Sequence, residues 1–96
     1  MENWIYEYDK SKDAANIEKH GFPLGFAIYV FRDANRTETI DDRFDYNEVR
    51  YLTYGLIEDR VFCVCYTVRG NVRRIISFRP VHRKEKRIAY DKHQND

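Results

Sequence analysis

Residues 73–79 read Arg-Arg-Ile-Ile-Ser-Phe-Arg, so three guanidinium groups and one hydroxyl surround a small apolar centre. A strand that only fills a core does not need cations at both ends of its apolar centre. The planar guanidinium fork of arginine can hold two oxygens of one phosphate group. The stretch therefore predicts a sheet face that holds a polyanion while its back packs against helices.

The charges of the chain are unevenly distributed, although the net charge is only +1. Residues 32–59 contain eight acids and four arginines, whereas residues 60–90 contain nine cations and one acid. Such asymmetry is typical of a protein with an anionic partner, and together with the arginine strand it points to RNA. A basic helix that is merely solvated would give the same asymmetry.

The two cysteines, Cys63 and Cys65, project from the same face if they lie in a strand. That spacing suits neither a disulfide nor a metal site without further ligands, so we expect core-facing thiols in a reducing cytoplasm. No apolar run approaches the roughly 18–20 residues of a membrane helix, and no signal peptide is recognisable. We expect one soluble, cytoplasmic domain over residues 1–96, without contact to a membrane.

Two helices are predicted in the first third of the chain, after a short edge strand at residues 4–8. The first spans about residues 10–20, with Asp9 as its N-cap and Gly21 in the left-handed position after its last turn. Its buried stripe is expected to include two residues, Ala14 and Ile17. The second helix begins at Pro23, with apolar residues at 24, 27, 28 and 31 facing the sheet.

The rest of the chain predicts an antiparallel meander followed by a terminal helix. A weak strand is expected at 37–40 and stronger strands at 49–57, 61–68 and 72–79, with reversals at 58–59 and 70–71. Residues 61–68 are nearly all apolar, which indicates a central strand. The last helix is expected from about 82 to 92. The fold class is therefore α+β.

Strand alternation decides which side chains of residues 73–79 face the groove. The odd-numbered residues share one face, so Ser77 and Arg79 are expected to line the groove. The apolar even-numbered residues, including Phe78, are expected in the core. Arg74 falls on that apolar side, so it must either extend to the rim or sit beside a bulge in the strand.

Three segments in this order resemble the BrnT toxins of BrnT–BrnA type II toxin–antitoxin pairs. They are Asn-Ile-Glu-Lys-His-Gly at 16–21, Asp42-Arg43 with Glu48-Val-Arg50, and Arg-Ile-Ile-Ser-Phe-Arg at 74–79, and the resemblance extends from Tyr8 to Tyr90. It departs from the family pattern at residues 23–26, at Val81 and at Phe78, which is expected to reshape the floor of the site.

The resemblance implies a RelE-like fold, in which a small antiparallel sheet packs against two N-terminal helices and one C-terminal helix. It also implies a ribonuclease that arrests translation and a DNA-binding BrnA antitoxin as partner. Operator DNA would be contacted only through the antitoxin, because the complex of the two proteins represses their own operon.

Metal-independent RNA cleavage needs a base for the ribose 2′-hydroxyl and cations for the phosphorane. The sequence offers no cage of carboxylates and histidines, so we expect neither a metal nor another cofactor. The candidate residues are His20 for proton transfer, Arg50, Arg74 and Arg79 for the phosphorane, Lys19, Ser77, Arg83 and Tyr90 for substrate binding, and Glu48 to orient Arg50 or Arg79.

Structural alternatives stay open for each of these residues. His20 suits the C-terminal end of a helix dipole, Arg79 could form a surface salt bridge with Glu48 or Asp42, and Tyr90 could simply anchor the last helix. At the level of function, the alternatives are a catalytically degenerate module that binds RNA or the antitoxin, and a metal-dependent nuclease.

Overall fold

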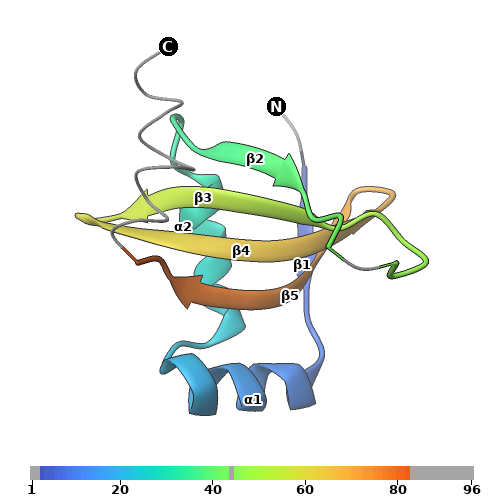
Figure 1. The fold of residues 1–96 in the computed structure, drawn as a ribbon, viewed down its shortest axis with the longest axis horizontal. Coiled ribbons are helices and arrows are strands. Elements are labelled where there is room, and N and C mark those ends of the chain that lie inside the picture. Colours follow the sequence, from blue (N-terminus) through green and yellow to red (C-terminus); the bar gives the residue numbers. More distant parts are fainter. Residues whose placement is uncertain (1–2, 44, 83–96) are drawn as a thin grey trace.

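A five-stranded sheet organises the computed structural model, which describes residues 3–43 and 45–82 (Figure 1). The strands stand in the order β1-β5-β4-β3-β2. Their bounds are β1 Ile5–Glu7, β2 Thr37–Ile40, β3 Tyr51–Ile57, β4 Arg60–Arg69 and β5 Val72–Pro80. The predicted meander is confirmed, since β3, β4 and β5 are joined by short reversals and pair antiparallel. β4 is central, and residues 61–67 are buried, as their apolar run predicts.

The sheet is mixed rather than purely antiparallel, which corrects one part of the predicted fold. β1 is an edge strand as expected, but it runs parallel to β5, with Tyr6 opposite Arg73 and Glu7 opposite Arg74. The direction of this strand was not encoded locally, because its partner lies more than sixty residues away along the chain. β1 covers only the first three residues of β5, so the rest of that edge needs another partner.

Two α-helices occur among the described residues. α1 spans Lys10–His20, with Asp9 accepting from the amide of Ser11 at 2.8 Å and Gly21 at φ 83° donating to the carbonyl of Ile17. Both predicted caps are therefore confirmed. The second predicted helix is a 3₁₀ turn at Leu24–Phe26 followed by α2 at Ala27–Phe31.

The main core lies between α2 and the sheet, and it is rich in aromatic rings. Phe78 is fully buried and stacks on Phe62 with ring centroids 4.9 Å apart, while Phe22 meets both edge-on. A smaller apolar cluster on the other face contains Tyr54, Val61 and Cys63. Cys63 and Cys65 share that face; both are buried, and neither forms a disulfide.

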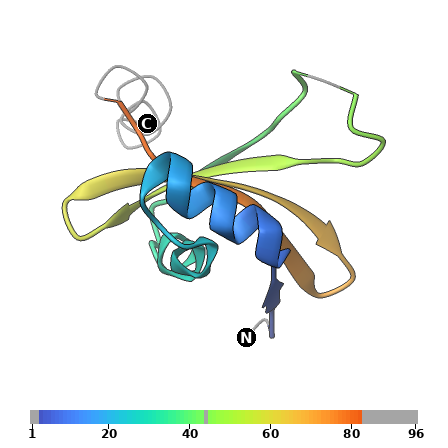
Figure 2. The same cartoon turned by 90° about the horizontal axis from the view of Figure 1, so that it is seen from below.

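The inner side of α1 is polar, so the expectation that Ala14 and Ile17 are buried is wrong. Both are exposed, and Asn16 is the buried residue of the helix. α1 lies along the edge of the sheet rather than on its face (Figure 2). The side chain of Asn16 accepts from the amide of Phe78 at 3.1 Å and donates to the carbonyls of Phe78 and Phe22 at 2.8 Å each. Asn16 thus replaces the missing strand partner where β1 has ended.

The helix predicted at about 82–92 lies outside the described residues, apart from His82, as do the candidate site residues Arg83 and Tyr90. The RelE-like architecture stays a prediction. Within residues 3–43 and 45–82, no helix is long and apolar enough to cross a membrane.

Candidate nucleic-acid interface

A bulge in β5 decides which arginines share a face. Cys65 and Tyr66 are neighbours on β4, but they pair with Ser77 and Ile75, so Ile76 is an extra residue between them. The extra residue shifts the alternation by one position. As a result Arg74 lies on the same face as Ser77 and Arg79, which confirms the bulge as the solution for Arg74.

The same bulge makes simple alternation wrong for Arg73 and Ile75, which face the helices. Arg73 is 8% exposed, and its guanidinium carbon lies 4.2 Å from the ring centroid of Trp4 and 4.1 Å from that of Phe31. It also donates to the hydroxyl of Tyr6 at 2.9 Å. Arg73 is therefore a structural cation held by aromatic rings.

Arg50 belongs to the open face, opposite the helices. Tyr51, the first residue of β3, packs on the helix side opposite Tyr66. Arg50, just before the strand, is therefore expected on the other face, near Thr67, whose hydroxyl donates to the carbonyl of Val49. Thr67 pairs in turn with Arg74. Arg50 and Arg74 therefore stand two strands apart, roughly 10 Å, on one face.

The guanidinium of Arg50 lies against two neighbours, although its buried Nε makes no hydrogen bond. Its central carbon lies 3.8 Å from the ring centroid of Tyr46, and its Nε lies 3.5 Å from a carboxylate oxygen of Glu48. Glu48 also contacts Arg69 at 3.3 Å. Glu48 is thus placed to orient Arg50, one of the two arginines predicted for it.

Arg74 is already paired with an acid from the neighbouring strand. Its guanidinium lies 2.9 Å from the carboxylate of Glu7 on β1, and both side chains are partly exposed. An exposed pair of this kind is worth little in stability, so the guanidinium can turn toward a phosphate at small cost.

A hollow of about 230 Å³ lies between α1 and the bulge, and it brings together predicted residues from distant parts of the sequence. Ser77 contributes from β5, and Lys19 and His20 contribute from the last turn of α1. Burial, the charge of Lys19 and that of Arg79 lower the pKa of His20 below its ordinary 6.5. The lowered pKa favours the neutral imidazole near pH 7, and the residues that line the hollow do not include Arg79.

Lys12 also lines this hollow, and sequence reasoning missed it. Lys12, Asn16, Lys19 and His20 follow the spacing i, i+4, i+7 and i+8, which places them on one side of a helix. That periodicity was the available signal. It was overlooked because the buried side of α1 was expected to be apolar.

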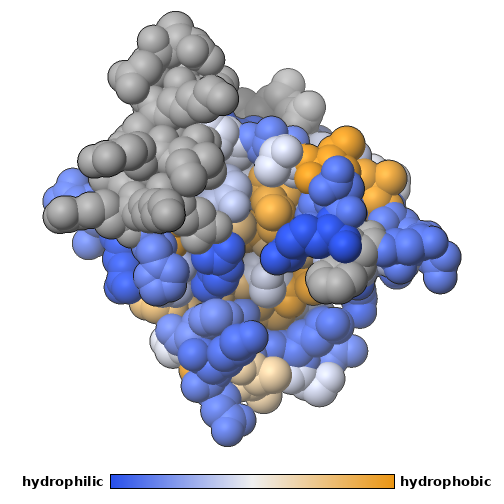
Figure 3. Space-filling view, in the orientation of Figure 1, coloured by the Kyte–Doolittle hydropathy of each residue, from blue (hydrophilic) through white to orange (hydrophobic). Residues whose placement is uncertain are grey.

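Cationic side chains surround the open face on several sides. Figure 3 views this face and shows hydrophilic residues interrupted by apolar patches in the middle and at the upper right. The pKa of the buried Cys65 thiol is raised by burial and by Asp41, while Arg50, Arg43 and Lys12 act in the opposite direction. Arg43 and Arg50 belong to the loop before β3 and Lys12 to α1, and Asp41 and Glu48 balance part of their charge. A face of this kind suits a polyanion.

The loop before β3 is fixed by a buried acid. The carboxylate of Asp41 accepts two bonds from the Arg43 guanidinium, at 2.7 and 2.9 Å, and one from the hydroxyl of Tyr46 at 3.2 Å. These contacts lower its pKa from 3.8 to about 2. Since the ring of Tyr46 lies under Arg50, Asp41 also steadies Arg50.

The ionised Asp41 should stabilise the fold only above acid pH. Its folded pKa lies below the unfolded value, so its contribution is complete above about pH 4 and is lost as the pH falls through 2. Because Arg43 is largely exposed, the effect should be about 1 kcal/mol. Urea unfolding at pH 5 and pH 2 measures it. Asp41→Asn should be less stable than wild type at pH 5, with the gap closing at pH 2; an unchanged gap would contradict the assignment.

Within the part of the chain that the structure describes, no group of three or more histidine, cysteine, aspartate or glutamate side chains is placed to hold a metal ion. The arrangement can instead bind phosphate through arginine and lysine and move a proton through His20.

Comparison with known proteins gives one family. A family model described as "Ribonuclease toxin, BrnT, of type II toxin-antitoxin system" matches residues 8–85. No curated protein matches the chain.

Proposed function

Because the chain belongs to the BrnT family of ribonuclease toxins of type II toxin–antitoxin systems, we propose that it cleaves RNA without a metal ion at the open face of its sheet. The observation that supports this most is the bulge, which puts Arg74 on the same face as Ser77 and Arg79, and Ser77 also lines the hollow that contains His20.

In the proposed reaction the ribose 2′-hydroxyl attacks the adjacent phosphorus. Neutral His20 takes the proton of that hydroxyl, and Arg79 stabilises the added charge on the phosphorane oxygens. The bond to the 5′-oxygen then breaks, and solvent protonates the leaving oxygen. The products are a 2′,3′-cyclic phosphate and a 5′-hydroxyl.

The remaining candidates are assigned to substrate binding and orientation. Arg50 and Arg74 hold neighbouring phosphates along the open face, while Lys12, Lys19 and Ser77 hold the phosphate at the hollow. Glu48 and Tyr46 keep Arg50 in place. Arg83 and Tyr90 stay predicted substrate contacts.

A catalytically degenerate module is the alternative function. Phe78 departs from the family pattern next to the hollow, since this buried residue bonds through its amide and carbonyl to Asn16, which lines the hollow. That this departure reshapes the floor of the site stays a prediction.

The family description implies a protein antitoxin. We propose a DNA-binding antitoxin of the BrnA type, with the toxin reaching operator DNA only through that partner. The proposed compartment is the cytoplasm, and two cysteines without a disulfide fit its reducing conditions.

Expression of the chain without an antitoxin tests the function. Translation should stop, and mapping of RNA ends should show new cleavage sites that the uninduced culture lacks. Normal growth with intact RNA would contradict the proposal. RNA binding without cleavage would support the degenerate module instead.

The rate of cleavage should fall in acid because His20 must be neutral to accept a proton. The fall should be centred below pH 6.5, since the pKa of His20 is lowered. Lys19→Ala should move this fall to higher pH, because the charge of Lys19 helps to lower that pKa. Single-turnover cleavage of a short RNA between pH 4.5 and 8 measures it. An acid fall that survives in His20→Gln would assign the proton transfer to another group.

A further inference from the structure

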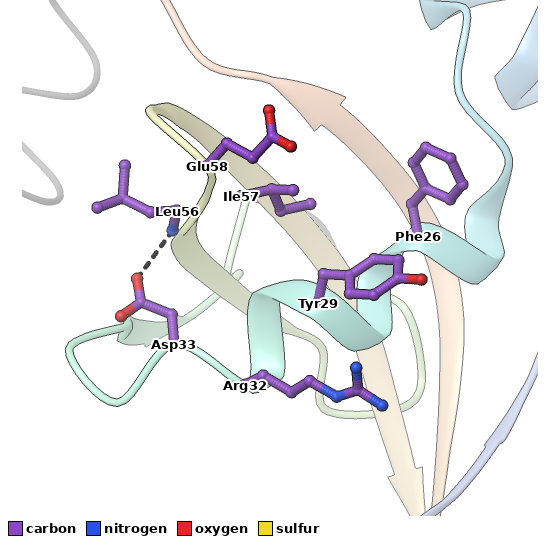
Figure 4. A pocket seen from close by; sticks show the side chains of 7 residues that line it. All are labelled: Phe26, Tyr29, Arg32, Asp33, Leu56, Ile57 and Glu58. Atoms are coloured by element: carbon purple, nitrogen blue, oxygen red, sulfur yellow. Dashed lines mark hydrogen bonds between the residues drawn. The ribbon is translucent and has the colours of Figure 1, made fainter.

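A second hollow, of about 530 Å³, lies on the helix side of the molecule and has no part in the proposed RNA site. It is lined by Phe26, Tyr29, Arg32 and Asp33 of the η1–α2 segment and by Leu56, Ile57 and Glu58 at the end of β3 (Figure 4). Aromatic, aliphatic and charged side chains line it together, and the proposed RNA site uses none of them.

The walls of this hollow are fixed in place. A carboxylate oxygen of Asp33 accepts from the amide of Leu56 at 2.8 Å, which ties the end of α2 to β3 (Figure 4). Gly55 allows this approach, since a Cβ there would lie 3.0 Å from a methyl of Val30. The hollow is therefore preformed, and a ligand would not have to open it.

The composition of the hollow is typical of a protein-binding hot spot. Phe26 and Tyr29 are 42% and 46% exposed, and their rings meet edge-on with centroids 6.0 Å apart. The guanidinium of Arg32 lies over the Tyr29 ring at 5.4 Å. Tyrosine and arginine beside aromatic and aliphatic side chains are enriched where partners insert an apolar anchor.

The charge of the hollow argues against RNA as its occupant. Its lining has one cation, Arg32, and two acids, Asp33 and Glu58, whereas the residues that line the hollow beside α1 include two lysines and no acid. The carboxylate of Asp33 is engaged by the amides of Asn35 and Leu56, and Glu58 stands at the rim. This charge repels phosphate and complements a cation beside an apolar anchor.

We propose that this hollow is the docking site for the protein antitoxin, which inserts a large apolar side chain between Tyr29 and Ile57 and pairs a neighbouring lysine or arginine with Glu58. The inference rests on the antitoxin partner in the proposed function but not on the RNA chemistry. Since the hollow is on the opposite side of the sheet from the basic face, docking here leaves the open face for a second segment of the antitoxin.

The test measures the affinity of each toxin variant for the antitoxin encoded beside it, with the full-length proteins and isothermal titration calorimetry. Tyr29→Ala should weaken binding by about 30-fold, and Glu58→Lys by at least tenfold. Tyr29→Phe keeps the ring and should bind normally. Glu58 has φ 58°, and lysine meets the same backbone constraint there, so the charge reversal adds no backbone strain.

Two matched controls separate the hollow from general effects. Tyr8 is 44% exposed on another part of the surface, and Glu18 is exposed on α1. Tyr8→Ala and Glu18→Lys should leave the affinity unchanged. Thermal unfolding of every variant, compared with Tyr29→Phe, shows whether a loss of binding comes from a loss of folding.

Unchanged affinity in both Tyr29→Ala and Glu58→Lys would overturn the proposal, and so would a wild-type toxin that binds no antitoxin. If these variants lose RNA binding instead, the occupant of the hollow is RNA. If they lose self-association, the occupant is a second copy of the chain. RNA cleavage by each free variant is measured separately. If neither the wild type nor any variant cleaves RNA, but the affinities for the antitoxin change as expected, the ribonuclease proposal fails and the docking site stands.

Discussion

Arg79→Ala should lower the rate of RNA cleavage by about 10²–10³-fold and leave the domain folded. The size follows from the loss of one charged group aimed at the oxygens on which charge develops. Arg79 lies on the open face opposite Cys63, and its charge is one cause of the lowered pKa of His20. The measurement is single-turnover cleavage of a short RNA, with thermal unfolding of the same preparation.

Arg60→Ala is the matched control, because it removes the same charge from the helix side of the molecule. The guanidinium of Arg60 lies over the rings of Phe22 and Phe62 in the main core. This variant should cleave RNA at nearly the wild-type rate. If Arg79→Ala instead lowers the melting temperature strongly and keeps its activity, Arg79 is a structural residue and the proposed phosphorane contact is wrong.

Asn16→Leu should destabilise the fold by about 3–4 kcal/mol, because it leaves three backbone groups without their partner. The amide and carbonyl of Phe78 and the carbonyl of Phe22 all bond to this one side chain. For a chain of this size the melting temperature should fall by more than about 12 °C. Urea unfolding followed by circular dichroism gives the free energy of unfolding directly.

Ile17→Ala serves as the control for this variant, and it separates two views of α1. If α1 were a face-packing helix with an apolar stripe, Ile17→Ala would be the costly change. Because Ile17 is 45% exposed, its truncation should cost less than about 1 kcal/mol. A small effect at Asn16 together with a large effect at Ile17 would show that the helix packs differently.

The sequence predicted the elements well where the signal was local. The caps of α1 depend on Asp9 and Gly21, which act within a few residues, and both were correctly assigned. The meander follows from alternation and from turn residues at the two reversals. The central position of β4 follows from its apolar run, since only a strand covered on both faces can bury so many apolar residues.

The errors arise where a contact joins distant parts of the chain. Asn16 is a poor residue for a helix stripe, and only its partner, the edge of β5, explains why it is buried. The parallel direction of β1 depends on the same edge. In both cases the nearby sequence does not reveal that part of the edge of β5 has no neighbouring strand.

The candidate site was partly predictable for a different reason. The conflict over Arg74 was visible in the sequence, because a cation on the apolar side of a strand must still reach solvent or an acid. A bulge was one of two solutions, and the pairing of β4 with β5 decides between them. The hollow beside α1 was less predictable, because Lys12 and Lys19 line it together with Ser77, which is distant in the sequence.

The products of RNA cleavage test the central claim most directly. The purified protein, incubated with a short RNA in excess chelator, should give fragments with 2′,3′-cyclic phosphate ends, and Arg79→Ala should give almost none. Fragments with 3′-hydroxyl ends, or activity that disappears in chelator and returns with a divalent metal, would contradict a reaction run by His20 and the arginines of the open face.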